Sequence, residues 1–391
     1  MEESIRTNSW FPRGICNSLE SLDESPPGFK GWNLATAWGS FNAYEIVDLS
    51  IALNEGKSWG EVPETFEIIN QDGCSFELES KGEFWRVEHL PFTDGLPDRE
   101  FLRELSEAPC GGIRFKGQDL LLFWKGKKSG IPLNEALAEN PEAVAEALGD
   151  FLGECATAAM QKVSLNNDER VWNDRLKEME DRLSTNTLWR APHSPDTRGT
   201  ATFRHLRPEH ITISDGKLNF SGVWGGLESQ ILGMSPRRPA IADLGAAFAL
   251  IHEHCPEENR DQALRSAGLA WSKKAPKRLS SRRALDAHLG GLHIWVYEAM
   301  LNRLCISRAL GEEEPSFISH HLQRVGTIQA GMFQARSWSA LALMSFSAAV
   351  LVPTAWVWGY VSASQILLAP VFLFAGLWFR EVYRSKAPSC W

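Results

Sequence analysis

Two histidines five residues apart bracket the segment in which chemically useful side chains are most concentrated. His205 and His210 enclose an arginine, a proline and a glutamate, and the sequence Ile-Thr-Ile follows at 211–213. Imidazole titrates near neutral pH, so His205 could accept a substrate proton as a general base. The alternative is that His205 is an ordinary hydrogen-bonding residue of a loop.

The pattern around these histidines resembles the catalytic loop of the protein-kinase-like superfamily, in particular its aminoglycoside-phosphotransferase branch. That loop reads HGDxxPxN, or HRDLKPEN in eukaryotic-type protein kinases, and this chain keeps its frame through Leu206, Arg207, Pro208, Glu209 and Ile211. Segments 238–254 and 268–289 are similar to later helical segments of the superfamily, so the resemblance covers roughly residues 65–310.

The resemblance implies that the positions that carry the chemistry are substituted. His205 stands in place of the catalytic aspartate, and His210 in place of the metal-binding asparagine. Phe220 or Val223, depending on the alignment, stands at the second metal-binding aspartate. Because phosphoryl transfer depends on Mg²⁺, which prefers oxygen ligands, we expect no catalytic residue at these degenerate positions and no metal site. ATP would then bind, if at all, without Mg²⁺.

The first strands also lack the usual nucleotide signature, because no GxGxxG motif lies between them. Arg86 or a neighbour occupies the place of the family's phosphate-pairing lysine, and Glu104 or Glu100 is a candidate partner for it. These are the candidate cofactor-binding residues. The alternative is that Arg86 is an ordinary exposed strand residue.

The hydrophobic pattern predicts a small antiparallel lobe followed by a helical lobe. Strand-like runs at 65–71, 74–80 and 83–92 are separated by turn signals, a helix is expected at 98–108, and a strand pair at 112–126. Helices are expected at 140–161, with Asn140 as N-cap, and at 169–183, with Val171, Leu176, Met179 and Leu183 as its apolar residues. Together with the resemblance, this pattern indicates an α+β, bilobal protein-kinase-like fold with a C-terminal transmembrane hairpin.

The corresponding division of the chain has five parts. An N-terminal extension of uncertain structure, 1–60, precedes the N-lobe, 61–130, and the helical C-lobe, 131–320. The transmembrane hairpin, 337–380, and a short tail, 381–391, complete the chain.

The C-terminal tail gives the clearest indication of where in the cell the protein lies. No charged residue occurs from Ser337 to Phe379, and one helix of that length would be about 60 Å long, twice the hydrocarbon thickness of about 30 Å. We therefore expect a turn near 359–365. Because the second arm is short and contains Pro370, the alternative is a hairpin that is partly re-entrant and does not cross the membrane fully. Basic residues outside both arms favour cytoplasmic termini, with the soluble body on the same side.

Two further clusters have competing interpretations. His252, Glu253, His254 and Cys255 include zinc-type ligands, but adjacent helical positions point apart, which favours a plain helix end. A basic run could face anionic lipid or form a solvated helix start; it comprises Lys273, Lys274, Lys277, Arg278, Arg282 and Arg283.

Composition excludes some partners. The net charge of -9 argues against nucleic acid, and seven scattered cysteines without a CxxC pair fit a reducing compartment. Membrane lipid, through 337–380, and a protein are the partners expected. The sequence favours a membrane-anchored, inactive kinase-like scaffold. The alternatives are an atypical phosphotransferase that borrows ligands such as Asp215 or Glu228, and a membrane-assembly protein whose hairpin is the functional part.

Overall fold

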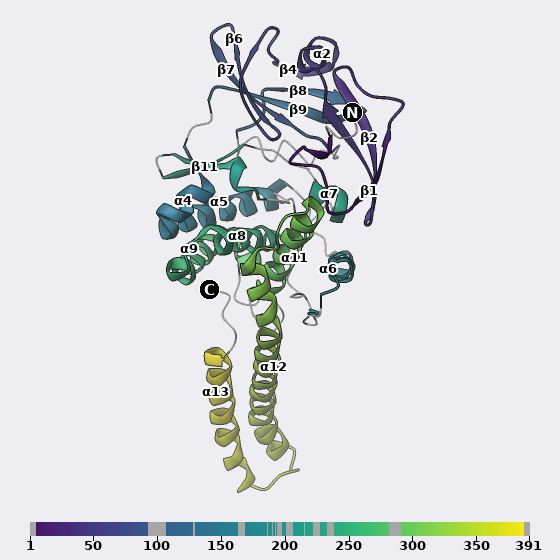
Figure 1. Ribbon diagram of the computed structural model, residues 1–391. Helices are drawn as coiled ribbons and strands as arrows, with labels where there is room; N and C mark the ends of the chain where they lie inside the picture. The colour runs from purple at the N-terminus through teal and green to yellow at the C-terminus, as the bar shows by residue number, and fades with distance from the viewer. Residues whose placement is uncertain are drawn as a thin grey trace.

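The computed structural model shows two sheet-rich layers at one end, a helical body, and a projecting helical hairpin (Figure 1). The structure describes residues 5–92, 107–127, 130–162, 169–185, 187–189, 191, 193, 198–200, 206–214, 216–221, 227–232, 238–280 and 291–386. Its strands are β1 (Cys16–Ser21), β2 (Phe29–Thr36), β3 (Gly39–Ile46), β4 (Lys57–Gly60), β5 (Glu67–Asp72), β6 (Ser75–Ser80), β7 (Glu83–His89), β8 (Gly111–Phe115), β9 (Gln118–Lys125), β10 (Ile131–Pro132), β11 (Ile211–Ser214) and β12 (Lys217–Phe220).

Helices dominate the second half of the chain. They are α2 (Leu49–Glu55), α4 (Leu133–Glu139), α5 (Pro141–Lys162), α6 (Glu169–Leu183), α7 (Leu227–Leu232), α8 (Ile241–His254), α9 (Glu257–Lys274), α10 (Lys277–Ser280), α11 (His293–Leu310), α12 (Ser316–Val357) and α13 (Leu368–Lys386), with short 3-10 helices η1 (Pro208–His210) and η3 (Gln365–Leu367).

The first lobe is built on a six-stranded antiparallel sheet with the order β4-β8-β9-β7-β6-β5. Its predicted strands and turns are confirmed. Gly73, Gly82 and Gly117 have positive φ angles at the three hairpin turns, a conformation that glycine adopts without a steric cost. Alternate residues of β6 are buried, as expected for a strand with one face on a core. The helix expected at 98–108 falls largely outside the described residues.

The N-terminal segment, for which the sequence indicated no elements, is largely ordered. Strands β1, β2 and β3 form a separate antiparallel sheet, and β4 joins the edge of the main sheet. Within the segment, Ile5, Phe11 and Leu34 are fully buried in the large core that extends into the helical lobe. Hydrophobic burial therefore ties this segment to the body.

The helical lobe is organised by close helix pairs. A Cβ added at Gly149 of α5 would lie 2.2 Å from the carbonyl oxygen of Ala267 in α9, so the two helices can approach closely only with glycine there. Trp271 of α9 and Trp295 of α11 are almost fully buried. Helix α5 begins at Pro141 after Asn140, as predicted.

Helix α6 departs in one detail from its predicted apolar face. Leu176, Met179 and Leu183 are buried as expected, but Val171 is 48% exposed and the neighbouring Trp172 is 2% exposed instead. The larger indole ring removes more apolar surface from water, so the helix is rotated to bury it.

A third, small sheet places the loop-like segment between the lobes. Strand β11 pairs with β10 and with β12, and η1 directly precedes it. The antiparallel lobe, the helical lobe and this intervening hairpin give the two-lobed architecture predicted from the sequence.

The C-terminal hairpin consists of two long apolar helices. Helix α12 is 42 residues long; its first half packs on the body through Ile318, Val325 and Met332, and its second half projects away (Figure 1). The turn falls where it was predicted, since α12 ends at Val357 and η3 begins at Gln365. Pro370 lies in the first turn of α13, where its missing N–H costs no helical hydrogen bond.

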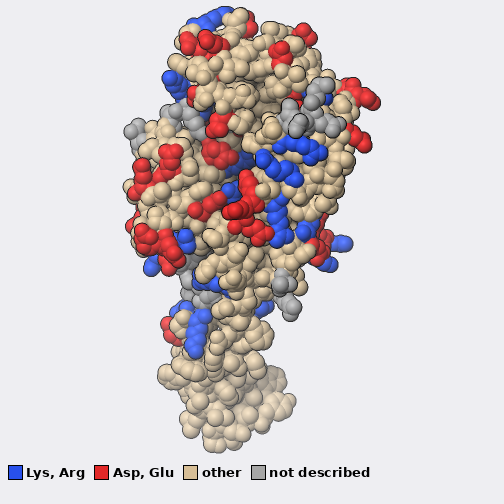
Figure 2. Space-filling view, viewed as in Figure 1, with Lys and Arg blue, Asp and Glu red and all other residues tan. Residues whose placement is uncertain are grey.

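The two arms pack directly against each other. A Cβ added at Gly376 would lie 2.8 Å from the ring of Phe346, so a glycine allows this close approach. Most other large apolar side chains of the arms face outward, and Figure 2 shows the lower end of the hairpin free of charged residues in this view. Both helices are long and apolar enough to cross a membrane.

Candidate functional site

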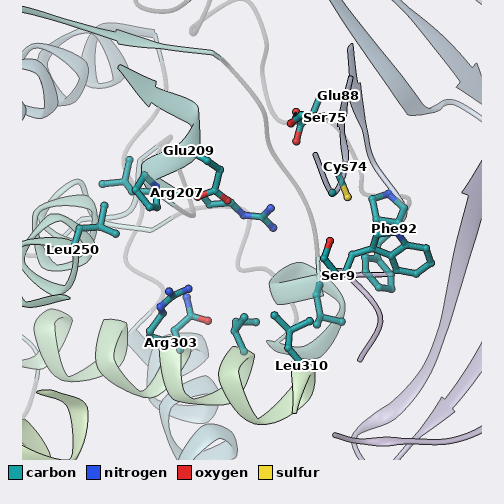
Figure 3. Close-up of a pocket in the computed structure, with 18 of the residues that line it drawn as sticks. Ser9, Cys74, Ser75, Glu88, Phe92, Arg207, Glu209, Leu250, Arg303 and Leu310 are labelled. Carbon is teal, nitrogen blue, oxygen red and sulfur yellow. Dashed lines mark hydrogen bonds between the residues drawn. The ribbon is translucent and has the colours of Figure 1, made fainter. Parts of the chain in front are cut away.

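A cavity of about 500 Å³ lies between the main sheet and the helical lobe. That volume is within the ordinary range for small-molecule sites. The β5–β6 turn and the end of β7 line one side, the η1 segment lines another, and helices α8 and α11 close it. Figure 3 shows Arg207 and Glu209 reaching into the space between Cys74 and Glu88 on one side and Arg303 on the other.

The hairpin turn above the cavity bears no phosphate-binding signature. Asp72, Gly73, Cys74 and Ser75 supply one carboxylate, one thiol and one hydroxyl. Burial is the main cause that raises the pKa of Cys74 to about 12, with the charge of Glu88 adding to it, so its thiol stays protonated at neutral pH. A thiol in that state is a poor nucleophile and metal ligand.

A hydrogen-bonded link joins the sheet to the degenerate loop. His210 Nε2 lies 3.3 Å from Glu88 Oε1, and the Ser75 hydroxyl donates to Glu88 Oε2 at 2.5 Å. Burial acts to raise the pKa of Glu88, but the bonds from His210 and Ser75 and the charge of Arg207 outweigh it and lower that pKa. Glu88 is therefore ionised at neutral pH, in the cleft beside the position expected for a metal ligand.

Of the other degenerate positions, only Phe220 is described. Its side chain is fully buried in the large hydrophobic core, on the last residue of β12. A phenyl ring in that position offers no oxygen to a cation. His205, Val223 and Asp215 lie outside the described residues, as does the side chain of Glu228.

Arg86 has an acidic partner in the sheet. Its guanidinium contacts the Glu107 carboxylate at 2.5 Å and lies 5.7 Å from the centre of the Trp124 ring. The Glu107 amide in turn donates to the carbonyl oxygen of Phe220, so the pair lies near β12. Glu104 and Glu100 are outside the described residues. Arg86 is not among the residues that line the cavity.

The helical side of the cavity carries charge pairs that the sequence did not indicate. Arg303 of α11 donates to both carboxylate oxygens of Glu253 of α8, at 2.5 and 3.1 Å. Arg238 lines the cavity and donates at 2.9 Å to Glu298, which lies in the protein interior. The importance of Glu88 could have been inferred from the sequence in one way only. Glu88 is two residues from Arg86, so the two side chains lie on the same face of β7.

The side chains of His252, Glu253 and Cys255 have separate surroundings and do not meet at a common site. Glu253 pairs with Arg303, the His252 ring lies 6.0 Å from that of His321, and Cys255 is buried. Among the residues that the structure describes, no group of three or more His, Cys, Asp or Glu side chains could hold a metal ion. In the basic run, Lys274 pairs with Glu154 at 2.9 Å.

Lowering the pH is expected to weaken the fold through His89, which lines the cavity. Burial lowers the pKa of His89 to about 4, although its bond to the Tyr44 carbonyl oxygen opposes the shift. Because the folded pKa lies below the unfolded value of about 6.5, stability is full above pH 6.5 and falls by about 3 kcal/mol as the pH drops towards 4.

Thermal unfolding between about pH 4 and pH 8 measures this effect. The variant His89→Gln keeps a donor for the Tyr44 carbonyl oxygen but cannot titrate, so its stability should depend less on pH. The exposed His320→Gln serves as the control and should retain the wild-type slope. Equal slopes in all three proteins would contradict the assignment.

Comparisons with known proteins yield likenesses of fold. No protein-family model and no curated protein matches the chain. A glucosamine kinase structure is 12% identical with a TM-score of 0.44, covering 80% of this chain and 95% of its own. A choline kinase from Cryptosporidium parvum is 8% identical with a TM-score of 0.39, covering 69% and 90%.

A macrolide 2'-phosphotransferase from Brachybacterium faecium is 12% identical with a TM-score of 0.33, covering 67% of this chain and 91% of its own. The two-lobed architecture itself rests on the elements described above.

Proposed function

We propose that this chain is a membrane-anchored, kinase-like protein without phosphotransfer activity, which acts as a binding or regulatory scaffold. The observation that carries the proposal is the link between Glu88 and His210. The imidazole at the position of a metal-binding asparagine is engaged with a buried carboxylate 3.3 Å away, and so is not directed at a bound magnesium ion.

The electrostatics of the cleft also oppose a nucleotide triphosphate. A phosphate oxygen brought within about 4 Å of ionised Glu88 would be repelled by about 4 kcal/mol at an effective dielectric constant of 20. Asp72, Glu209 and Glu312 add carboxylates to the cavity lining. Arg207 attracts phosphate, but its charge already stabilises ionised Glu88.

The anchoring part of the proposal is supported by the hairpin. Leu343, Val350, Phe374 and other apolar side chains of its arms are exposed in the protein alone, and a bilayer would cover them. Arg336 precedes the first arm, while Arg380, Arg384 and Lys386 follow the second. By the positive-inside rule, both ends and the body would face the cytoplasm.

Nucleotide binding tests the inactive cleft directly. The full-length protein in detergent is titrated with ATP in the presence of Mg²⁺ and in the presence of a chelator, and phosphate release is measured in parallel. We expect no magnesium-dependent stabilisation and no turnover. Binding of ATP that is equal with and without Mg²⁺ would fit a scaffold that senses nucleotide.

A paired variant sharpens the test. Glu88→Gln combined with His210→Asn removes the carboxylate and installs an amide ligand, so magnesium-dependent ATP affinity should rise by roughly tenfold or more. Glu312→Gln removes a carboxylate from the cavity lining outside the link and should change affinity much less. Magnesium-dependent turnover by the unmodified protein, abolished by His205→Ala, would overturn the proposal.

A further inference from the structure

The hairpin ends in a neck, which comprises Arg336, Trp338, Trp378, Phe379 and residues 380–386. From Ser337 to the end of α12 at Val357, the first arm is about 31 Å long at 1.5 Å per residue, which matches the hydrocarbon thickness of a bilayer. The exposed Trp358 and Tyr360 mark the far end. With the first arm across a bilayer, the neck lies at the membrane–water interface on the side of the soluble body.

Aromatic rings and cations meet at this level from both helices. The Trp338 ring stacks on that of Phe379 with a centroid distance of 5.8 Å, and it lies 6.1 Å from the Trp378 ring. Lys386 Nζ lies 5.9 Å from the centre of Trp338. Such amphipathic rings are enriched where a bilayer meets water.

The neck carries excess positive charge. It contains Arg336, Arg380, Arg384 and Lys386 against the single carboxylate of Glu381, which leaves a net charge of +3. Glu381 contacts Arg384 at 3.5 Å. The positive charge thus lies immediately outside the uncharged arms.

Two donors of the neck have no hydrogen-bond partner in the part of the chain that the structure describes. They are Arg336 Nε and the Trp338 indole Nε1, both buried. A buried donor without an acceptor destabilises a protein, so such groups ordinarily have one. Both donor atoms lie beneath the surface of the neck, so a phosphate oxygen would reach them once the two side chains turn outward.

We propose that the neck binds the phosphate of an anionic phospholipid, in the leaflet that faces the body. This inference rests on the anchoring function proposed above, since only an inserted hairpin brings the neck to headgroup depth. The guanidinium of Arg336 and the ammonium of Lys386 contact the phosphate, while Trp338 packs beside the glycerol region. The occupant is a membrane lipid because the site continues directly into the apolar arms.

The test uses the full-length protein in nanodiscs of phosphatidylcholine, alone or mixed with phosphatidylglycerol. The lipids that remain bound are measured by native mass spectrometry. The wild type should retain phosphatidylglycerol preferentially. Arg336→Gln and Lys386→Gln should each lower that preference by about fivefold, the effect of about 1 kcal/mol per charge near the surface. The combined neck variant carries both Arg336→Gln and Lys386→Gln, and its charge-matched control is the double substitution Lys57→Gln and Lys127→Gln in the first lobe.

Each outcome has a distinct meaning. Equal lipid retention by the wild type and the combined neck variant, or an equal loss in the control, would overturn the lipid site. Displacement of phosphatidylglycerol by added inorganic phosphate would show that the site takes free phosphate, which also overturns it. Failure to enter phosphatidylcholine nanodiscs at all would instead contradict the anchoring proposal.

Discussion

Glu298→Ala is expected to destabilise the helical lobe by about 3–5 kcal/mol, the usual cost of removing one partner from a buried ion group. Glu298 of α11 is 4% exposed, and its Oε1 lies 3.1 Å from Arg175 Nε and 2.9 Å from Arg238 Nη2. Burial lowers the pKa of Arg175 to about 10, although the charge of Glu298 acts to raise it. The variant would leave two buried arginines without that carboxylate.

Thermal or urea unfolding of the full-length protein in detergent measures this loss. Glu298→Gln keeps the shape and one acceptor oxygen but removes the charge, so it should fall between the wild type and the alanine variant. Glu64→Ala is the control, because it breaks the solvent-exposed pair with Lys81 and should leave stability unchanged. Equal stability of Glu298→Ala and the wild type would contradict a structural role for this triad.

Val350→Arg is expected to displace the protein from membranes. Val350 lies in the middle of the first arm and is 68% exposed in the protein alone. If the arm lies in the bilayer, an arginine at this depth disfavours insertion by about 2.5–3.5 kcal/mol, or roughly a hundredfold in the insertion equilibrium. The measurement is the fraction of chain that stays in the membrane pellet after alkaline carbonate extraction.

Val47→Arg provides a closely matched control. Val47 is 67% exposed, so the two substitutions place the same side chain at positions equally open to water in the isolated protein. Val47 lies between β3 and α2, where the change should alter stability by less than about 0.5 kcal/mol and leave the membrane fraction unchanged. Equal behaviour of the two variants would show that the first arm does not enter the bilayer.

These predictions separate the three working parts of the molecule. The buried triad around Glu298 lies in the helical lobe, and the bond between Glu88 and His210 joins the main sheet to the η1 segment beside the cavity. The hairpin is attached to the same body through the first half of α12. The body that carries the cavity and the first apolar arm are therefore joined by one continuous helix.

The candidate site was only partly predictable. The frame of residues 206–211 located the loop, and the structure places His210 beside Glu88, which lines the cavity, and Phe220 in the core. Glu88 was missed because its importance depends on a partner 122 residues away. No local pattern distinguishes a carboxylate that will face a distant imidazole from one that will face water.

By itself, the sequence determined the local elements and the class of the fold. Strand-like runs separated by glycine turn signals predicted the strands and their turns. The absence of charge from Ser337 to Phe379 predicted the apolar arms, and a weakly apolar stretch predicted the turn between them. These features follow from backbone sterics and from the cost of burying charge, which act over a few residues. Only the tertiary structure decided that Trp172 replaces Val171 in the core, that Arg86 meets Glu107, and that Glu298 joins two arginines. Those outcomes depend on packing and on electrostatic contact between distant segments, which have no fixed spacing along the chain.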